Sequence, residues 1–269
     1  MTTIQLGFIG AGNMAEALAR GILRAGLMKP REMFAADPQE RRRTLFEREL
    51  KVPTTADNQA VVDQAPVVVI AVKPQVFEKA LAPLAGLFGP KKLLISICAG
   101  LSTRHIEETV AAGTRVVRAM PNTPMLAGRG MSAVCAGAAA KPADVAKAQR
   151  LLGAAGQVIR VPEDLMDAVT AVSGSGPAYF FYFTELLAAA GVKVGLSEDD
   201  ARLLARVTFE GAAKLLAESA EGPAELRRRV TSPGGTTEAA LKSFDALGLA
   251  KIVDAAVAAA RDRGRELGR

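Results

Sequence analysis

The first part of the chain alternates short apolar runs with longer stretches that mix apolar and charged residues. Runs such as Val67–Val72 and Leu93–Ile97 are apolar at nearly every position, which is typical of strands buried on both faces of a sheet. The stretches between them are helical in pattern, so strand and helix repeat in turn and predict a mostly parallel sheet with crossover helices. Strands are expected at 4–9, 33–36, 67–72, 93–97 and 114–120.

The first of these strands leads into a turn with the spacing of a dinucleotide-binding fingerprint. Ile4–Ile9 is followed by Gly10-Ala11-Gly12-Asn13-Met14-Ala15 and then by an Ala/Leu-rich helical stretch. Gly10 permits the tight turn, and Gly12 lets a pyrophosphate approach the backbone. The N–H groups at the helix start supply an anion site. An ordinary strand-turn-helix is the alternative, but strand, turn and helix all agree, so we predict nucleotide binding.

Near Val161 the strand-like runs end, and the rest of the chain is helical in pattern. Helices are expected at 163–172, 178–190, 198–220 and from 237 to the C-terminus. The aromatic run Tyr179–Phe183 is apolar on more than one face, which favours burial against a second copy of the chain, with a self-contained bundle as the alternative. The sequence therefore predicts an α/β fold with two domains. These are a Rossmann-like dinucleotide-binding domain, 1–161, and an all-helical domain, 162–269.

Several turn residues follow the predicted strands and are expected at one edge of the sheet. In an open parallel sheet, ligands bind beyond the carboxyl ends of the strands. Ordinary turn chemistry also explains Pro, Gly and Asn at such positions. Their coincidence at one edge favours a cofactor rim made of Gly10, Gly12, Asp37, 71–74, 99–100 and 120–122.

Two glycine-rich segments interrupt the helical part. Ser173–Pro177 predicts a kink or a break, because Gly and Pro in a helix interior cost roughly 1 and 3 kcal/mol. Close helix packing would explain its small residues equally well. Thr231–Glu238 places two glycines before hydroxyl residues and a helix start, an arrangement that suits a small carboxylate. An N-cap preceded by a flexible loop is the alternative.

Composition narrows the classes of function. The longest apolar run, 65–72, is far shorter than the roughly 20 residues that span a bilayer, so no membrane partner is expected. Met1-Thr2-Thr3 has no basic region of the signal-peptide type, which predicts a cytoplasmic protein. The net charge is +6, but the arginine clusters lack interleaved aromatic residues, so no nucleic-acid partner is expected.

The chain is poor in catalytic side chains. Cys98 and Cys135 are far apart and lack metal-ligand spacing, so no metal is expected. The single histidine, His105, lies at the start of an expected surface helix and is a poor candidate for a base. A nicotinamide cofactor would supply the hydride itself, so that the protein needs only to bind, align and polarise its substrate.

Five segments together resemble the Δ1-pyrroline-5-carboxylate reductase family. The resemblance runs along the whole chain and implies hydride transfer from the nicotinamide C4 to the C5=N imine of L-1-pyrroline-5-carboxylate. The product would be L-proline, in the last step of proline biosynthesis. The segments that carry the resemblance are Gly7–Met14, Ala71–Pro74, Arg118–Pro124, Ala171–Tyr179 and Ser232–Thr237.

The resemblance also implies which residues bind the substrate and the cofactor. Thr237 is expected to hydrogen-bond the ring nitrogen as the catalytic residue, and Glu163 and Thr170 are expected close to the substrate. The substrate carboxylate is expected on the loop residues Ser232, Gly234, Gly235 and Thr236. Cofactor-binding residues are expected to be Ile9, Gly10, Ala11, Gly12, Asn13, Met14, Asp37, Asn58, Ala71, Val72, Lys73, Pro74, Ala99 and Gly100.

The family resemblance implies NADPH as the cofactor, but one residue leaves NADH open. Asp37 stands where many members of the family have a small polar residue, and an aspartate there normally bonds the 2′-hydroxyl of NADH. Arg41 and Arg42 follow closely and are candidates for a 2′-phosphate. The resemblance further implies an intertwined homodimer that assembles into a larger homo-oligomer.

Two other functions fit parts of the sequence. A β-hydroxyacid or 6-phosphogluconate type dehydrogenase also joins a nucleotide domain to a helical one, but it typically needs a lysine base on the long helix, and no lysine lies between Glu163 and Gly191. A non-catalytic nucleotide-binding regulator has no need for a second carboxylate site, so the Ser232–Thr237 loop counts against it.

Overall fold

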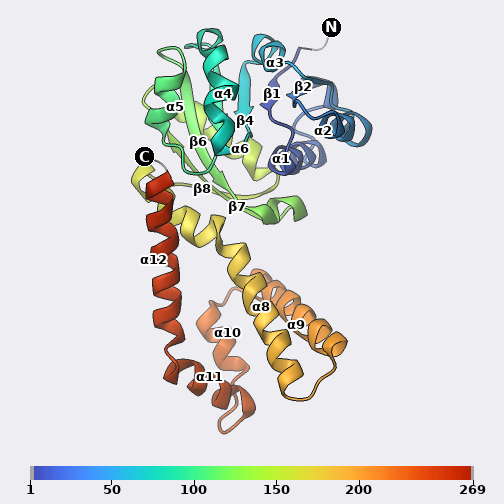
Figure 1. The fold of residues 1–269 in the computed structure, drawn as a ribbon, viewed down its shortest axis with the longest axis vertical. Coiled ribbons are helices and arrows are strands. Elements are labelled where there is room, and N and C mark those ends of the chain that lie inside the picture. Colours follow the sequence, from blue (N-terminus) through green and yellow to red (C-terminus); the bar gives the residue numbers. More distant parts are fainter. Residues whose placement is uncertain (1–2, 268–269) are drawn as a thin grey trace. The chain divides into compact units, whose positions relative to one another are not determined.

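The computed structural model describes residues 3–267 of the 269-residue chain (Figure 1). The chain forms two compact units. The first comprises the chain up to Ser175 together with the segment from Ala260 onward, and the second comprises Gly176–Ala259. No helix within residues 3–267 is long and apolar enough to cross a membrane.

Eight strands within the described residues form one sheet in the first unit, in the order β3-β2-β1-β4-β5-β6-β7-β8. Every neighbouring pair is parallel except β6 and β7. The part from β3 to β6 has the strand order of the doubly wound dinucleotide-binding fold, with its switch point between β1 and β4. The strands are β1 (Leu6–Ile9), β2 (Met33–Ala36), β3 (Thr54–Thr55), β4 (Val67–Ile70), β5 (Leu93–Ser96), β6 (Arg115–Pro121), β7 (Gly130–Ala136) and β8 (Gly156–Arg160).

Alternate residues of β4 enter two separate cores, one on each face of the sheet. Val67 and Val69 belong to a core shared with α1 and α6, whereas Val68 and Ile70 pack with α3, α4 and α5. This burial on both faces explains the continuous apolar run in the sequence. The helices of this unit are α1 (Asn13–Arg24), α2 (Glu40–Leu45), α3 (Asn58–Gln64), α4 (Phe77–Leu81), α5 (Thr103–Thr109), α6 (Pro142–Gly153) and α7 (Met166–Val169).

The second unit is helical, as predicted, and α12 ends in the first unit. Within this unit α8 packs on α9, with Phe180 and Phe209 stacked at a centroid distance of 5.7 Å. The expected C-terminal helix is broken at Leu247–Gly248, where Gly248 has a φ of 77° that stops α11. The helices are α8 (Gly176–Lys193), α9 (Glu198–Glu218), α10 (Pro223–Arg229), α11 (Thr236–Ala246) and α12 (Leu249–Leu267).

The predicted mostly parallel sheet is confirmed, but three of its strands were missed. β3 has only two residues, which is too short for a periodic signal. β7 contains Gly130 and Ser132, and β8 is an edge strand with the exposed residues Gln157 and Arg160, so neither is a continuous apolar run. Strands that are rich in small and polar residues cannot be predicted from the hydrophobic pattern.

Candidate active site

The dinucleotide turn between β1 and α1 is tight at Gly10 and open at Gly12. Gly10 has a φ of 92°, and a Cβ there would lie 2.9 Å from the carbonyl oxygen of Ala71, so this position requires glycine. A Cβ at Gly12 would meet nothing within 4 Å. Gly12 caps α1, and the N–H groups of Asn13 and Met14 lie in the first helical turn, where they have no intrahelical acceptor. The turn therefore has the space and the donors that a pyrophosphate requires.

Side chains from the second βα unit bond both polar groups of Ala11. The Oδ2 atom of Asp37 accepts the Ala11 N–H at 2.8 Å, and Oδ1 accepts the Gln39 N–H at 2.9 Å. The Nε atom of Arg42 donates to the Ala11 carbonyl oxygen at 2.6 Å, and a second nitrogen of its guanidinium donates to Glu16 at 2.8 Å. Asp37 is buried at 8% exposure, so its carboxylate faces the turn.

Glu16, in the first turn of α1, is ion-paired with Arg20 and Arg42. Burial raises the pKa of Glu16, but hydrogen bonds from Arg42 and Arg20 and the charges of these arginines bring it below its ordinary value of 4.5. Arg43 donates to the carbonyl oxygens of Asp37 and Pro38 at 2.8 and 3.0 Å. Arg41, the remaining member of the arginine cluster, is exposed on α2.

The remaining residues predicted to bind the cofactor follow β4 and β5 or begin α3. Ala71–Pro74 follow β4, Ala99 and Gly100 follow β5, and Asn58 begins α3 behind the N-cap Asp57. The carboxyl ends of β1 to β5 lie at one edge of the sheet, since these strands are all parallel to their neighbours, and Asn58 follows the end of β3. The fold thus brings these residues to the same edge as Gly10–Met14.

A partly buried ionic cluster holds Glu163, which lies in a short helical turn before α7. Its Oε1 atom accepts from Arg118 at 2.5 Å and from the Thr103 N–H at 3.3 Å, and its Oε2 atom accepts from the Cys135 thiol at 2.9 Å. Arg118 on β6 is 5% exposed. Burial raises the pKa of Glu163, but the hydrogen bonds from Cys135, Arg118 and Thr103, with the Arg118 charge, bring it below its ordinary value of 4.5.

A hollow of about 290 Å³ next to this cluster connects two predictions. Gly100, predicted to bind the cofactor, and Glu163, predicted to lie near the substrate, both line it. Arg118, Asp167 and Arg265 contribute charged groups to the same hollow. The structure thus brings Gly100 and Glu163 together, although they are far apart in the sequence.

Thr170 begins a π-helical turn, Thr170–Gly174, that leads from α7 towards α8. Its hydroxyl donates to the Met166 carbonyl oxygen at 2.9 Å. A Cβ at Gly174 would lie 2.4 Å from the Met120 side chain, so this turn packs closely on the end of β6. The predicted interruption of the helix is therefore present, and Asn122 ties it to β6 through Ser173. The Gly-Ser-Gly-Pro run was the sequence signal for the turn, but nothing in the sequence indicated Asn122 as its partner.

Neither cysteine is poised for thiolate chemistry. Burial raises the pKa of the Cys98 thiol to about 11. Burial and the neighbouring Glu163 carboxylate raise the pKa of Cys135 still further. Within residues 3–267, no group of three or more His, Cys, Asp or Glu side chains is placed to hold a metal ion.

The Ser232–Thr237 loop lies in the second unit and leads into α11. Gly234 has a φ of 69°, and its N–H donates to the Glu238 carboxylate at 2.8 Å. The Gly235 N–H donates to the Ser232 carbonyl oxygen at 3.0 Å. Thr236 and Thr237 form the first turn of α11, where N–H groups have no intrahelical acceptor. The loop already binds one carboxylate, that of Glu238, which also pairs with Lys242 at 3.1 Å.

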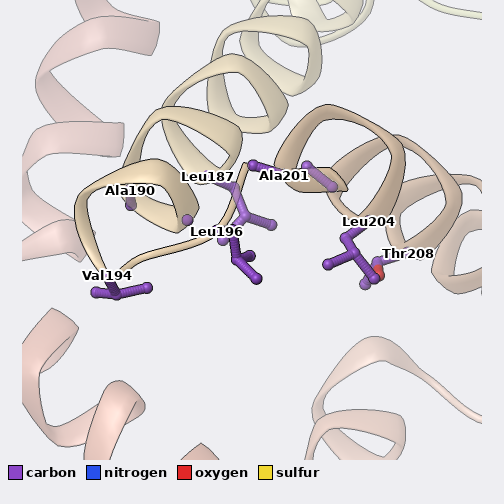
Figure 2. A pocket seen from close by; sticks show the side chains of 9 residues that line it. Leu187, Ala190, Val194, Leu196, Ala201, Leu204 and Thr208 are labelled. Carbon is purple, nitrogen blue, oxygen red and sulfur yellow. The ribbon is translucent and has the colours of Figure 1, made fainter. Parts of the chain in front are cut away.

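The helical unit exposes an unusual amount of apolar surface. A hollow of about 320 Å³ between α8 and α9 is lined by apolar side chains that include Leu187, Val194 and Leu204, with Thr208 at its polar end (Figure 2). In the run predicted to bury against a second copy, Phe181 and Tyr182 are 64% and 60% exposed. Apolar area of this extent marks an interaction surface.

Two family models match the chain. Residues 163–267 match the model described as pyrroline-5-carboxylate reductase dimerisation. Residues 5–100 match the model described as NADP oxidoreductase, coenzyme F420-dependent. The two matches fall on the helical part and on the dinucleotide-binding sheet, respectively.

Individual relatives match along the full length. A pyrroline-5-carboxylate reductase of Synechocystis is 42% identical over 267 residues, which is 99% of each chain. A solved pyrroline-5-carboxylate reductase structure from Coxiella burnetii is 35% identical and superposes with a TM-score of 0.92 over 100% of both chains. A Plasmodium falciparum pyrroline carboxylate reductase structure with NADP bound is 32% identical, with a TM-score of 0.86 and the same full coverage.

Proposed function

Because the chain belongs to the pyrroline-5-carboxylate reductase family, we propose that it reduces L-1-pyrroline-5-carboxylate to L-proline with NADPH as the hydride donor. The observation that carries this proposal is the presence, in one chain, of an open dinucleotide turn and a carboxylate-binding loop. Full-length similarity to reductases of this kind favours the same reaction. No observation favours a hydroxyacid dehydrogenase or a non-catalytic regulator.

The reaction requires the protein mainly to align the substrate with the cofactor. Bound NADPH supplies a hydride with its two electrons to C5 of the protonated imine, and the π electrons of the C=N bond move to nitrogen to give the secondary amine. The turn Gly10–Met14 would hold the pyrophosphate through the N–H groups of Asn13 and Met14, which have no intrahelical acceptor. Thr237 hydrogen-bonds the ring nitrogen and fixes the ring, so that C5 meets the hydride.

The Ser232–Thr237 loop holds the substrate carboxylate. We assign this contact to the hydroxyls of Ser232 and Thr236 and to the N–H groups of Gly234 and Gly235. The Glu238 carboxylate already occupies the Gly234 N–H, so the substrate would displace it, and Lys242 remains available to hold Glu238 afterwards. An intramolecular carboxylate at this position supports the chemistry assigned to the loop.

Glu163 and Thr170 are assigned to the substrate side of the first unit. Glu163 lines the same hollow as Gly100, which supports this placement. Its carboxylate is ionised and bound to Arg118, so Glu163 contributes fixed negative charge to the hollow and does not donate a proton there. Thr170 belongs to the π-helical turn, and such turns are frequent at functional sites.

NADPH is proposed over NADH because the Plasmodium relative is described with NADP bound and because residues 5–100 match a model named for NADP. Arg41 is exposed, lies four residues after the buried Asp37 in the sequence, and offers a cation for a 2′-phosphate. NADH stays open as a second donor. The residues assigned to the cofactor are Ile9, Gly10, Ala11, Gly12, Asn13, Met14, Asp37, Asn58, Ala71, Val72, Lys73, Pro74, Ala99 and Gly100.

The helical part is assigned to dimerisation. The match of residues 163–267 to a dimerisation model and the exposed apolar surface of α8 and α9 support a homodimer. We extend this to a larger homo-oligomer in the cytoplasm, with residues 1–161 as the dinucleotide domain and 162–269 as the dimerisation and substrate domain.

The test is a reduction assay with the purified protein. L-1-pyrroline-5-carboxylate is mixed with NADPH or with NADH, and the absorbance of the reduced nicotinamide is followed. Substrate-dependent oxidation, faster with NADPH, is expected. The absence of oxidation with either cofactor would refute the proposed reaction.

A further inference from the structure

The peptide groups that flank Ala11 are held from both sides by charged side chains. Asp37 accepts the N–H of Ala11 at 2.8 Å, and Arg42 donates to its carbonyl oxygen at 2.6 Å. Both side chains come from the segment after β2, about 26 and 31 positions away in the sequence. Ala11 lies between Gly10, which is fixed against Ala71, and Gly12, which faces open space.

From this geometry we infer that Asp37 and Arg42 act together as a clamp on Ala11, setting the conformation of the dinucleotide turn rather than reading the 2′ position of the cofactor. This inference rests on the proposed use of a nicotinamide dinucleotide. Asp37 and Arg42 are positioning residues in this role, because they act on the pyrophosphate through the backbone of Ala11 and Gly12.

The hydrogen bonds of both side chains support the clamp. Each oxygen of the Asp37 carboxylate accepts a backbone N–H, and the side chain is almost fully buried. Arg42 is bonded on one side to Ala11 and on the other to Glu16 in the first turn of α1, with side-chain exposures of 11% and 13% for the pair. Charge-assisted hydrogen bonds of this kind fix geometry more firmly than neutral ones.

Arg43 holds the backbone at Asp37 and so supports the clamp indirectly. Its guanidinium donates to the carbonyl oxygens of Asp37 and Pro38, which fixes the backbone that carries the Asp37 side chain. Asp37 and Arg42 are thus directed at the turn, and Arg43 at the backbone that carries Asp37. Of the three consecutive arginines, Arg41 is the one whose side chain is exposed.

The clamp predicts changes in the affinities for NADPH and NADH that differ from those caused by a residue contacting the 2′ position of the ribose. NADPH and NADH share the pyrophosphate and differ only at the 2′ position of the adenosine ribose. Loosening the turn weakens the contact that the two cofactors share, so both lose affinity by the same factor. A residue that repels or bonds the 2′ substituent changes the ratio of the two affinities.

The experiment measures binding of NADPH and NADH to the full-chain protein by isothermal titration calorimetry, without substrate. The variants are Asp37→Asn, which keeps the shape but replaces one acceptor with a donor, and Arg42→Met, which keeps the stem but removes both hydrogen bonds. Each is expected to bind both cofactors about tenfold more weakly, which corresponds to about 1.4 kcal/mol, with the ratio of affinities as in the wild type. Arg48→Met, at an exposed arginine with no assigned role in cofactor binding, is the matched control, and its affinities for both cofactors are expected to equal those of the wild type.

Thermal unfolding of each variant shows whether it is folded at the temperature of the titration, and the two variants test the clamp separately. Stronger NADPH binding by Asp37→Asn with unchanged NADH binding would overturn the inference, as would a loss confined to NADPH in Arg42→Met. Wild-type protein that binds both cofactors but does not reduce the imine would refute the proposed reaction alone. A changed ratio in a reductase that turns over normally would refute the clamp alone.

Discussion

Asn122 joins the end of β6 to the π-helical turn by donating its amide group to both oxygens of Ser173, the carbonyl oxygen and the hydroxyl oxygen, each at 3.2 Å. Its own Oδ1 atom accepts the Met131 N–H at 2.8 Å. One amide side chain therefore uses donors and acceptor to hold three segments of the first unit. A carboxylate of the same shape would keep the acceptor and lose the donors.

Asn122→Asp is therefore expected to destabilise the fold in a pH-dependent way. At about pH 7 the carboxylate faces the Ser173 carbonyl oxygen without a proton between them, and the loss is about 1–3 kcal/mol. As the pH falls through the carboxyl pKa, the protonated group donates again and the loss shrinks. The measurement is denaturant unfolding of variant and wild type at several pH values.

Ser173→Ala is the matched control for this prediction. It removes the hydroxyl but leaves the carbonyl oxygen as an acceptor for Asn122, so its loss of stability should be smaller and independent of pH. A pH-independent loss in Asn122→Asp would show that the donated hydrogen bonds do not matter.

Glu163→Gln is expected to lower stability by about 1 kcal/mol at neutral pH, because the buried Arg118 loses its short ion pair and keeps only the longer contact with Asp167 at 3.7 Å. The folded protein holds the pKa of Glu163 below 4.5. The stabilisation is therefore fully present above pH 4.5 and is lost as the pH falls through the lowered pKa. Unfolding curves of wild type and variant should converge in acid.

A surface pair supplies the comparison. Glu108 and Arg104 form a solvent-exposed ion pair, with side-chain exposures of 62% and 87%. Glu108→Gln should leave the unfolding midpoint unchanged, since exposed ion pairs contribute little. Equal behaviour of the two glutamine variants would argue against a structural role for the Arg118–Glu163 pair.

Thr237→Val tests the residue assigned to the ring nitrogen. The change keeps the shape and removes the hydroxyl, so kcat is expected to fall on the order of a hundredfold while the affinity for NADPH stays unchanged. Thr109→Val, on α5 outside the proposed site, should leave both unchanged. Loss of NADPH binding in Thr237→Val would place the loop at the cofactor instead.

Glu238→Gln tests whether the substrate carboxylate replaces an internal one. The amide can still accept the Gly234 N–H but carries no negative charge, so KM for the substrate is expected to fall by up to about fivefold. The values of kcat and KM for NADPH should not change. An increase in the substrate KM would mean that Glu238 assists binding instead of competing with it.

The sequence predicted those parts of the fold and site that depend on interactions between residues close together in the chain. The β1 strand, the turn at Gly10 and the start of α1 follow from side chains that are neighbours in the sequence. The contacts of Ala11 with Asp37 and of Asn122 with Ser173 join distant segments, and neither pair has a spacing that the sequence reveals. The short β3 and the polar edge strand β8 were missed because their residues do not alternate or form apolar runs.

The residue assignments show the same division. Glycines at 10 and 234 have positive φ and could be expected from turn chemistry alone. The Glu163 cluster could not, because Arg118, Cys135 and Thr103 meet it only through the packing of β6, β7 and α5. Only the family resemblance, and no pattern in the sequence itself, pointed to Glu163 as a site residue.

The most direct test of the central claim follows the hydride itself. The protein is incubated with L-1-pyrroline-5-carboxylate and with NADPH in which both hydrogens on the nicotinamide C4 are replaced by deuterium. The proline formed is analysed by mass spectrometry and NMR. The account predicts proline with a single deuterium, located at C5. Proline without deuterium, or no proline at all, would contradict hydride transfer from the cofactor to the imine carbon.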